Sequence, residues 1–122
     1  MSGPRYALYY APAADSALWR FGSAVLGYDA ITGEDIPFAL PDGCDVSSWP
    51  GLTEDPRRYG FHATLKAPFA LAPGRSEAQL RAFTHNYAAS LEPVVLTGLS
   101  VSALGSFVAL TPPGENPALQ RF

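Results

Sequence analysis

Charged residues are scarce in this sequence, and runs of positive charge are absent. Lys, Arg, Asp and Glu together make up 16% of the 122 residues, whereas an average globular domain has roughly 25%. The formal net charge is −3. Proteins that bind duplex nucleic acid need clustered positive charge, so we expect no such partner. A small phosphorylated ligand stays compatible with this composition because it needs only a few donors.

The sequence also lacks the cysteines and the long apolar runs of many secreted and membrane proteins. Cys44 is the only cysteine, so no intrachain disulfide can form, which suits a reducing compartment. No segment has the pattern of a signal peptide, and none approaches the roughly 20 apolar residues of a membrane span. We therefore expect a cytoplasmic protein that does not bind membranes.

Several common catalytic patterns are missing as well. The two histidines, His62 and His85, lie far apart in the sequence, and with one cysteine they do not form a His/Cys metal-ligand pattern. The sequence contains no Gly-x-Ser-x-Gly nucleophile elbow and no glycine-rich phosphate loop. We expect neither a metal nor another cofactor.

Hydrophobic residues make up 48% of the chain, which is enough for the core of one domain. Their spacing predicts strands at 5–11, 61–67, 94–104 and 107–110. Pro68 should end the second strand, and the two-residue turn Gly105-Ser106 should join the last two strands into a hairpin. Helices are predicted at 16–27, with Asp15 as N-cap, and from Ser76, which forms a capping-box pattern with Gln79, to the residue before Pro93. The order strand, helix, strand, helix, strand, strand indicates an α+β fold, an α/β two-layer sandwich with both helices packed on the sheet.

Two further segments bear on how the chain is organised. Residues 29–56 are interrupted by several prolines and glycines and predict a long Pro-rich loop. Asn116 followed by Pro117 predicts the start of a helix, and a few residues of helix are not stable alone. We expect residues 1–122 to form a single domain, the N-terminal lobe of a longer protein.

Polar side chains alternate along the predicted strand at 61–67. Because the side-chain period of a strand is two, His62, Thr64 and Lys66 should share the face opposite to that of the apolar residues, together with Gly60. A histidine exchanges protons near neutral pH, and a threonine hydroxyl can donate a hydrogen bond to a phosphate oxygen. Gly60 would allow a ligand close to the backbone. The row therefore indicates a phosphate-binding face.

Two segments, 59–69 (YGFHATLKAPF) and 5–12 (RYALYYAP), resemble the phosphonate-metabolism branch of the two-histidine phosphoesterase superfamily. The resemblance runs along nearly the whole chain. It implies a two-lobed, LigT-like fold with one His-x-Thr or His-x-Ser motif per lobe. This chain would be one lobe, with a mixed or antiparallel sheet and two packed helices. The superfamily includes cyclic nucleotide phosphodiesterases and tRNA 2′,3′-cyclic-phosphate or 2′-5′ ligase-type enzymes.

Carried over to this sequence, the resemblance makes His62 and Thr64 the catalytic pair of the first motif. One histidine would act as base and the other as acid on a cyclic or linear phosphodiester, without a metal. The second motif does not occur in this chain, so we expect an enzyme that is incomplete as it stands. The predicted partner is a small phosphorylated or cyclic-phosphate substrate, with Lys66 and Arg58 as candidate substrate contacts.

Other interpretations stay open for these residues. His62 also fits an ordinary histidine on a solvated sheet face, and Arg58 fits an ion-pair partner of Glu54 or Asp55. The chain as a whole could instead be a non-catalytic binding module for a phosphorylated metabolite or nucleotide. A homodimer that forms through the surface left by the missing lobe is a third possibility, because exposed apolar surface tends to find a partner. His85 is expected to face solvent.

Overall fold

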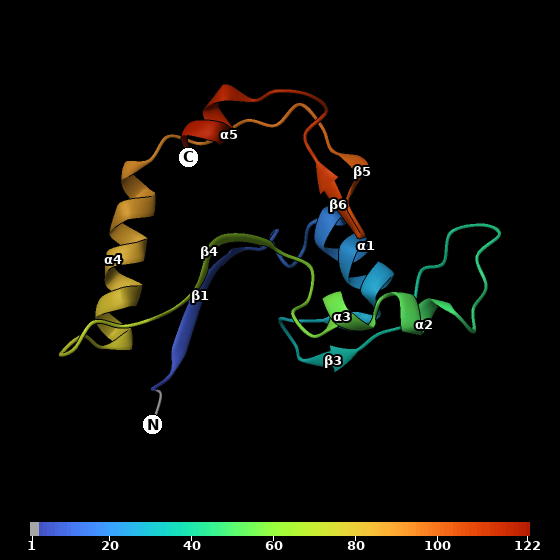
Figure 1. Ribbon diagram of the computed structural model, residues 1–122, viewed down its shortest axis with the longest axis horizontal. Coiled ribbons are helices and arrows are strands. Elements are labelled where there is room, and N and C mark those ends of the chain that lie inside the picture. Colours follow the sequence, from blue (N-terminus) through green and yellow to red (C-terminus); the bar gives the residue numbers. More distant parts are fainter. Residues whose placement is uncertain (1–2) are drawn as a thin grey trace. The chain divides into compact units, whose positions relative to one another are not determined.

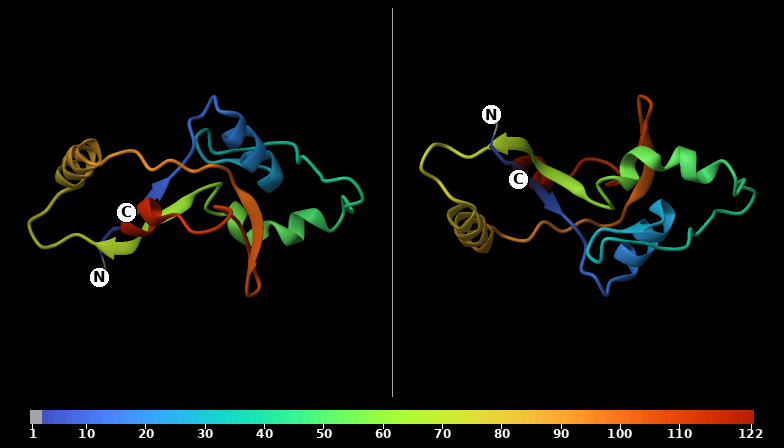
Figure 2. Two further views of the ribbon diagram at one scale, coloured as in Figure 1. Left: turned by 90° about the horizontal axis from the view of Figure 1, so that it is seen from above. Right: turned by 90° about the horizontal axis from the view of Figure 1, so that it is seen from below.

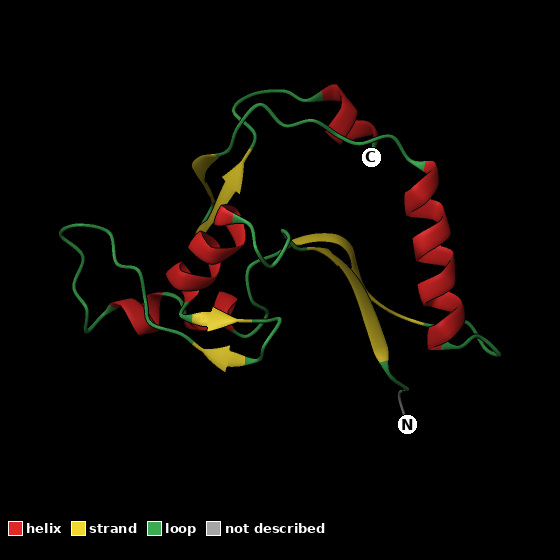
Figure 3. Cartoon of the chain, turned by 180° about the vertical axis from the view of Figure 1, so that it is seen from behind, coloured by secondary structure: helices red, strands yellow, loops and turns green. Residues whose placement is uncertain are grey.

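Two strands that are far apart in the sequence pair with each other in the computed structural model, which describes residues 3–122. β1 (Arg5–Tyr10) and β4 (Ala63–Ala70) run antiparallel, as Figures 1 and 3 show. They belong to the first of two compact units, Met1–Pro73 and Gly74–Phe122. The sheets of both units are short and antiparallel and alternate along the chain with several helices, so the predicted α+β class is confirmed.

The first helix of the first unit carries that unit's buried large apolar side chains. α1 (Ala17–Leu26) includes Trp19 and Leu26, which are 3% and 8% exposed. The predicted helix at 16–27 is confirmed, but its cap is Ser16 and not Asp15. The Ser16 hydroxyl oxygen accepts a hydrogen bond from the Trp19 amide at 3.1 Å, which satisfies a free N–H group of the first turn.

The long loop expected at 29–56 contains only short elements. They are β2 (Tyr28–Asp29), β3 (Glu34–Asp35), α2 (Trp49–Leu52) and α3 (Glu54–Arg57). Hydrogen bonds from side chains of α2 and α3 to the last carbonyls of α1 fasten the segment. Trp49 Nε1 donates to the Val25 carbonyl at 2.9 Å, and Arg57 Nε donates to the Leu26 carbonyl at 2.8 Å. The prolines therefore interrupt regular structure, while side chains keep the loop against the helix.

The second predicted strand is displaced along the sequence. β4 begins at Ala63, not at residue 61, and it continues through Pro68, which had been expected to end it. Proline is tolerated because β4 pairs only with β1, so its other edge needs no amide donor. His62 consequently lies just before the strand. Leu65 belongs to the apolar face predicted for this strand, and it is 50% exposed.

In the second unit, α4 (Glu77–Ser90) starts with the predicted capping box. Ser76 Oγ accepts from the Gln79 amide at 3.2 Å, and Gln79 Oε1 accepts from the Ser76 amide at 3.0 Å. The expectation that this helix packs on a sheet is wrong, because no residue of α4 is buried. Phe83 and Tyr87 are 68% and 57% exposed and stack on each other with ring centroids 6.0 Å apart.

A hairpin and a short helix complete the second unit (Figure 2). β5 (Ser100–Leu104) and β6 (Phe107–Thr111) pair antiparallel around the predicted two-residue turn at 105–106. The strand expected at 94–104 therefore starts later than predicted. α5 (Pro117–Arg121) is capped by Asn116, whose Oδ1 accepts from the Leu119 amide at 3.0 Å, as the Asn-Pro pair predicted.

None of the helices formed by residues 3–122 is long and apolar enough to cross a membrane.

The contact between α1 and the segment before β4 can be tested with a glycine replacement. A Cβ at Gly22 would overlap the ring of Phe61, whereas a Cβ at Gly51 in α2 would meet open space. Alanine normally favours a helix over glycine by about 1 kcal/mol, so Gly51→Ala should leave the free energy of unfolding unchanged or raise it. Gly22→Ala should lower it, because overpacking costs about 1–3 kcal/mol.

Urea unfolding followed by the fluorescence of Trp19 and Trp49 would measure both changes. If Gly22→Ala were as stable as Gly51→Ala, the packing of Phe61 against α1 would be refuted.

Candidate active site

Gly60 and Phe61, the two residues before His62, hold the segment that leads into β4 in place. Gly60 is buried and has a φ of +77°, in the left-handed region that residues with a Cβ rarely adopt. A Cβ added there would lie 2.5 Å from the Cβ of Ala30. The Phe61 ring lies against Gly22 of α1. His62 therefore directly follows two restrained residues, Gly60 in its left-handed turn and Phe61 with its packed ring.

Both ring nitrogens of His62 have a partner. Nδ1 lies 2.9 Å from the Gly60 carbonyl oxygen, and Nε2 lies 3.2 Å from Thr64 Oγ1. A carbonyl oxygen can only accept a hydrogen bond, so Nδ1 carries the proton in the neutral ring. Nε2 then has a free lone pair and accepts from the Thr64 hydroxyl. When the ring is protonated, Nε2 donates to Thr64 Oγ1 instead.

Aromatic rings flank the imidazole. The Tyr9 ring is stacked on His62 with centroids 3.9 Å apart and an angle of 24° between the planes. The Tyr59 ring lies 6.3 Å away and is tilted by 53°. Tyr9 and Tyr59 are 41% and 59% exposed, and His62 is half-buried. The imidazole is therefore enclosed on one face, while the region around it is open to solvent.

The pairing of β1 with β4 explains why Tyr9 reaches His62. Tyr9 is opposite Thr64 in the register, and directly opposed residues of an antiparallel pair point to the same face. His62 precedes Thr64 by two residues, and it contacts both the Thr64 hydroxyl and the Tyr9 ring. The expected juxtaposition of His62 and Thr64 is therefore present, although His62 itself lies outside the strand.

Lys66 does not continue this row. The register shifts between Tyr9–Thr64 and Leu8–Lys66, so that Leu65 is an extra residue in β4. Leu8 and Tyr9 are neighbours in β1 and point to opposite faces, and the pairing places Lys66 with Leu8. Its Nζ lies 5.3 Å from the centroid of the Phe69 ring. We expected the side chains of His62, Thr64 and Lys66 to share one face because they alternate along the strand. The bulge at Leu65 breaks this alternation before Lys66, so the expectation is wrong for Lys66.

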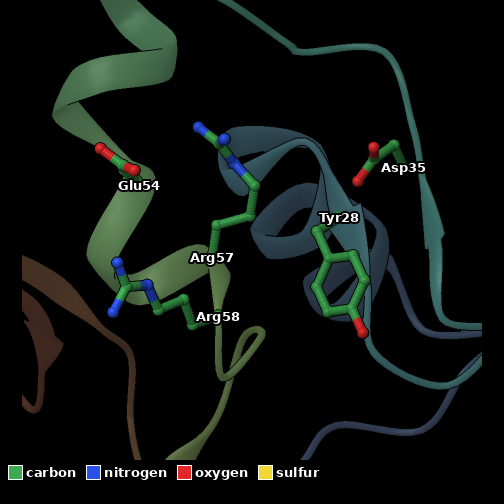
Figure 4. Close-up of a pocket in the computed structure, with 5 residues that line it drawn as sticks. All are labelled: Tyr28, Asp35, Glu54, Arg57 and Arg58. Carbon is green, nitrogen blue, oxygen red and sulfur yellow. The ribbon is translucent and has the colours of Figure 1, made fainter.

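Arg58 lies at the C-terminus of α3, where it is the cap residue. Figure 4 shows it beside a hollow of about 390 Å³ lined by Tyr28, Asp35, Glu54, Arg57 and Arg58. Among residues 3–122, no ion pair joins Arg58 to Glu54 or Asp55.

The neighbouring Arg57 has a structural role. Its guanidinium donates to the carbonyls of Leu26 and Pro50 at 2.8 and 2.5 Å, and to Thr53 Oγ1 at 2.8 Å. It also lies 5.2 Å from the centre of the Phe38 ring. The two arginine side chains point in different directions (Figure 4). Of the two guanidinium groups at the hollow, that of Arg58 is the one with no recorded hydrogen bond among the described residues.

The second histidine and the single cysteine both lie on the surface. His85 is exposed on α4, as predicted, and Cys44 is exposed as well. Within residues 3–122, no group of three or more His, Cys, Asp or Glu side chains could hold a metal ion. Sequence reasoning missed the Gly60 carbonyl and the stacking of Tyr9, because both depend on the backbone turn and on the strand register.

A family model and two curated relatives are similar to parts of this chain. Residues 64–122 match the family described as "Protein of unknown function (DUF1045)". The chain is 44% identical over 108 residues to the ribose 1,5-bisphosphate phosphokinase PhnN of Laribacter hongkongensis (strain HLHK9). It is 40% identical over 106 residues to the protein of that name from Janthinobacterium sp. (strain Marseille).

These alignments cover most of this chain but little of the relatives. They span 88% and 87% of the chain, and 25% and 23% of the two relatives. The chain thus spans about a quarter of the length of the curated relatives it matches. No solved structure matches it significantly.

The role of the Gly60 turn can be tested against a matched glycine. Gly60 and Gly33 have φ values of +77° and +75°, but a Cβ at Gly33 would meet open space. Both replacements by alanine should cost about 1–2 kcal/mol for the left-handed conformation. Gly60→Ala should cost more, because its Cβ overlaps Ala30, and it should displace the carbonyl that binds Nδ1 of His62.

Urea unfolding measures the stability difference, and ¹⁵N NMR of the His62 ring reports the hydrogen bond. A His62 ring that gives the same ¹⁵N signals in Gly60→Ala, Gly33→Ala and the unchanged chain would show that the Gly60 carbonyl does not fix the ring.

Proposed function

We propose that this chain carries one half-site of a metal-independent phosphoesterase that acts on a cyclic or linear phosphodiester. In this proposal His62 exchanges the proton and Thr64 binds a phosphate oxygen. The observation that carries it is the bridge from the Gly60 carbonyl through His62 to Thr64, with distances of 2.9 and 3.2 Å. It presents one ring nitrogen and one hydroxyl side by side.

The chemistry follows from the protonation of the ring. With Nδ1–H held by Gly60, Nε2 is the atom that takes a proton from an attacking water or hydroxyl, or returns one to a leaving oxygen. The Thr64 hydroxyl can turn from Nε2 to a non-bridging phosphate oxygen when a ligand is present. Both groups then contact the same phosphate, one at a bridging or attacking oxygen and the other at a non-bridging oxygen.

A complete reaction needs both an acid and a base. The resemblance to two-histidine phosphoesterases assigns the second group to another His-x-Thr or His-x-Ser motif, which this sequence does not contain. Removing one of two such groups lowers the rate roughly 10²- to 10⁴-fold. We therefore propose that this chain binds the phosphate group and contributes one proton-transfer step, while full activity requires the partner motif.

The class of substrate is proposed from the relatives. Both carry the name ribose 1,5-bisphosphate phosphokinase PhnN, and the sequence resembles the phosphonate-metabolism branch of its superfamily. A phosphorylated sugar or its cyclic phosphate, formed during phosphonate breakdown, fits both. Lys66 and Arg58 stay proposed substrate contacts, although neither has a recorded contact with His62 or Thr64.

A non-catalytic binding module is the second candidate. It is favoured by the presence of a single histidine in the His62–Thr64 site. Such a module would hold a phosphorylated metabolite or nucleotide through the same two side chains and would not turn it over.

Phosphate binding at His62 can be measured by NMR without any turnover. Addition of inorganic phosphate or a nucleoside 2′,3′-cyclic phosphate should shift the ring signals of His62 and leave those of the exposed His85 unchanged. Thr64→Val should weaken binding roughly tenfold or more, because a hydrogen bond to a charged group contributes about 1.5–3 kcal/mol. His62→Ala assigns the signals and should abolish the response.

The three outcomes separate the hypotheses. Binding at His62 together with hydrolysis of the cyclic phosphate, even at a low rate, supports the phosphoesterase. Binding without hydrolysis in a longer protein that includes the second motif supports the binding module. If His62 ignores both ligands, or responds no more than His85 does, the proposed half-site is refuted.

A further inference from the structure

The imidazole of His62 is held at its edges by only two hydrogen bonds, and one of them must be released to a ligand. Nδ1 keeps the Gly60 carbonyl, whereas Nε2 exchanges Thr64 for substrate in the proposed reaction. His62 lies before β4, so its own backbone is not part of the strand ladder. The last side-chain torsion of a histidine is broad and roughly two-fold. A ring held only at Nδ1 could tilt away from the phosphate.

Tyr9 supplies the missing restraint. Its ring covers one face of the imidazole at a centroid distance of 3.9 Å, with an angle of only 24° between the planes. Tyr9 is itself fixed, because it lies in β1 directly opposite Thr64. The same strand pairing therefore positions the hydroxyl that binds Nε2 and the ring that covers the imidazole.

We propose that Tyr9 is a positioning residue that keeps Nε2 of His62 directed at Thr64 and at a bound phosphate group. Its effect on ligand binding rests on the proposed function, whereas its effect on the ring of His62 does not. With one face of the imidazole covered, a ligand approaches through the Nε2 edge beside Thr64. This is the approach that in-plane proton transfer to a ring nitrogen requires.

The ring of Tyr9, and not its hydroxyl, carries this role. No hydrogen bond of the Tyr9 hydroxyl is recorded among the described residues, and stacking needs only the aromatic face. Tyr9→Phe should therefore preserve the positioning, and Tyr9→Leu should remove it. Tyr10→Leu is the matched control, because Tyr10 is the next residue of β1, is 54% exposed and pairs with Ala63.

The experiment is NMR of the His62 ring in the whole chain, with and without inorganic phosphate. In the unchanged chain, Tyr9→Phe and Tyr10→Leu, we expect the neutral ring to be protonated at Nδ1 and its carbon-bound protons to be shifted by the stacked ring current. In Tyr9→Leu the ring-current shift should fall to the contribution of Tyr59, and the contact of Nε2 with the Thr64 hydroxyl should loosen, while the Gly60 carbonyl keeps the proton at Nδ1. Phosphate affinity should fall about two- to tenfold, the range expected for loss of one aromatic pair.

Several results would overturn the proposal. Unchanged His62 signals in Tyr9→Leu would show that the ring does not depend on stacking. Equal damage in Tyr9→Phe would assign the role to the hydroxyl, and equal damage in Tyr10→Leu would indicate a general weakening of β1. If Tyr9→Leu does not fold, nuclear Overhauser contacts between the Tyr9 and His62 rings in the unchanged chain decide the matter, since their absence excludes the stacking.

The two proposals fail separately. If the tautomer and ring-current results hold while phosphate has no effect in the unchanged chain, the phosphate half-site is refuted and the positioning of His62 stands. If phosphate binds at His62 with the same affinity in Tyr9→Leu, the half-site stands and the role of Tyr9 is refuted.

Discussion

The hydrogen bond between His62 Nδ1 and the Gly60 carbonyl fixes the chemistry of the rest of the site. It selects which ring nitrogen is protonated, and so it leaves Nε2 to face Thr64. The carbonyl is aimed by a left-handed backbone turn that is buried against Ala30. His62 lies in an exposed region, yet its orientation depends on the buried Gly60. The residues packed around Gly60 hold it in a backbone conformation that would otherwise be unfavourable.

Local patterns in the sequence predicted the elements whose stability is local. The helix at 17–26, the capping box at Ser76 and the helix start at Asn116 all follow from side chains within a few residues of one another. The adjacency of His62 and Thr64 was predicted for the same reason, although the strand begins two residues later than predicted. A local sequence pattern does not show which element packs against the apolar face of a helix. Phe83 on α4 was expected to pack on a sheet and is exposed.

Features that depend on long-range pairing were missed. The stacking of Tyr9 on His62 joins residues from the two ends of the first unit, and it exists only in the register observed between β1 and β4. Single-sequence periodicity states which side chains share a face of one strand but not which residue of another strand lies opposite. The even sequence spacing of His62, Thr64 and Lys66 does not carry over to the ladder for this reason, because Lys66 pairs with Leu8 after the register shift.

The bulge at Leu65 also means that distance along the sequence and distance along the ladder differ by one step after Thr64. Counted in letters, His-x-Thr-x-Lys is an even spacing of three polar groups. Counted in rungs of the β1–β4 ladder, Thr64 and Lys66 occupy consecutive rungs and belong to different sides of the ribbon. A search for related sites that is written in sequence spacing would thus treat the lysine as part of the motif, whereas one written in ladder positions would end the motif at the threonine.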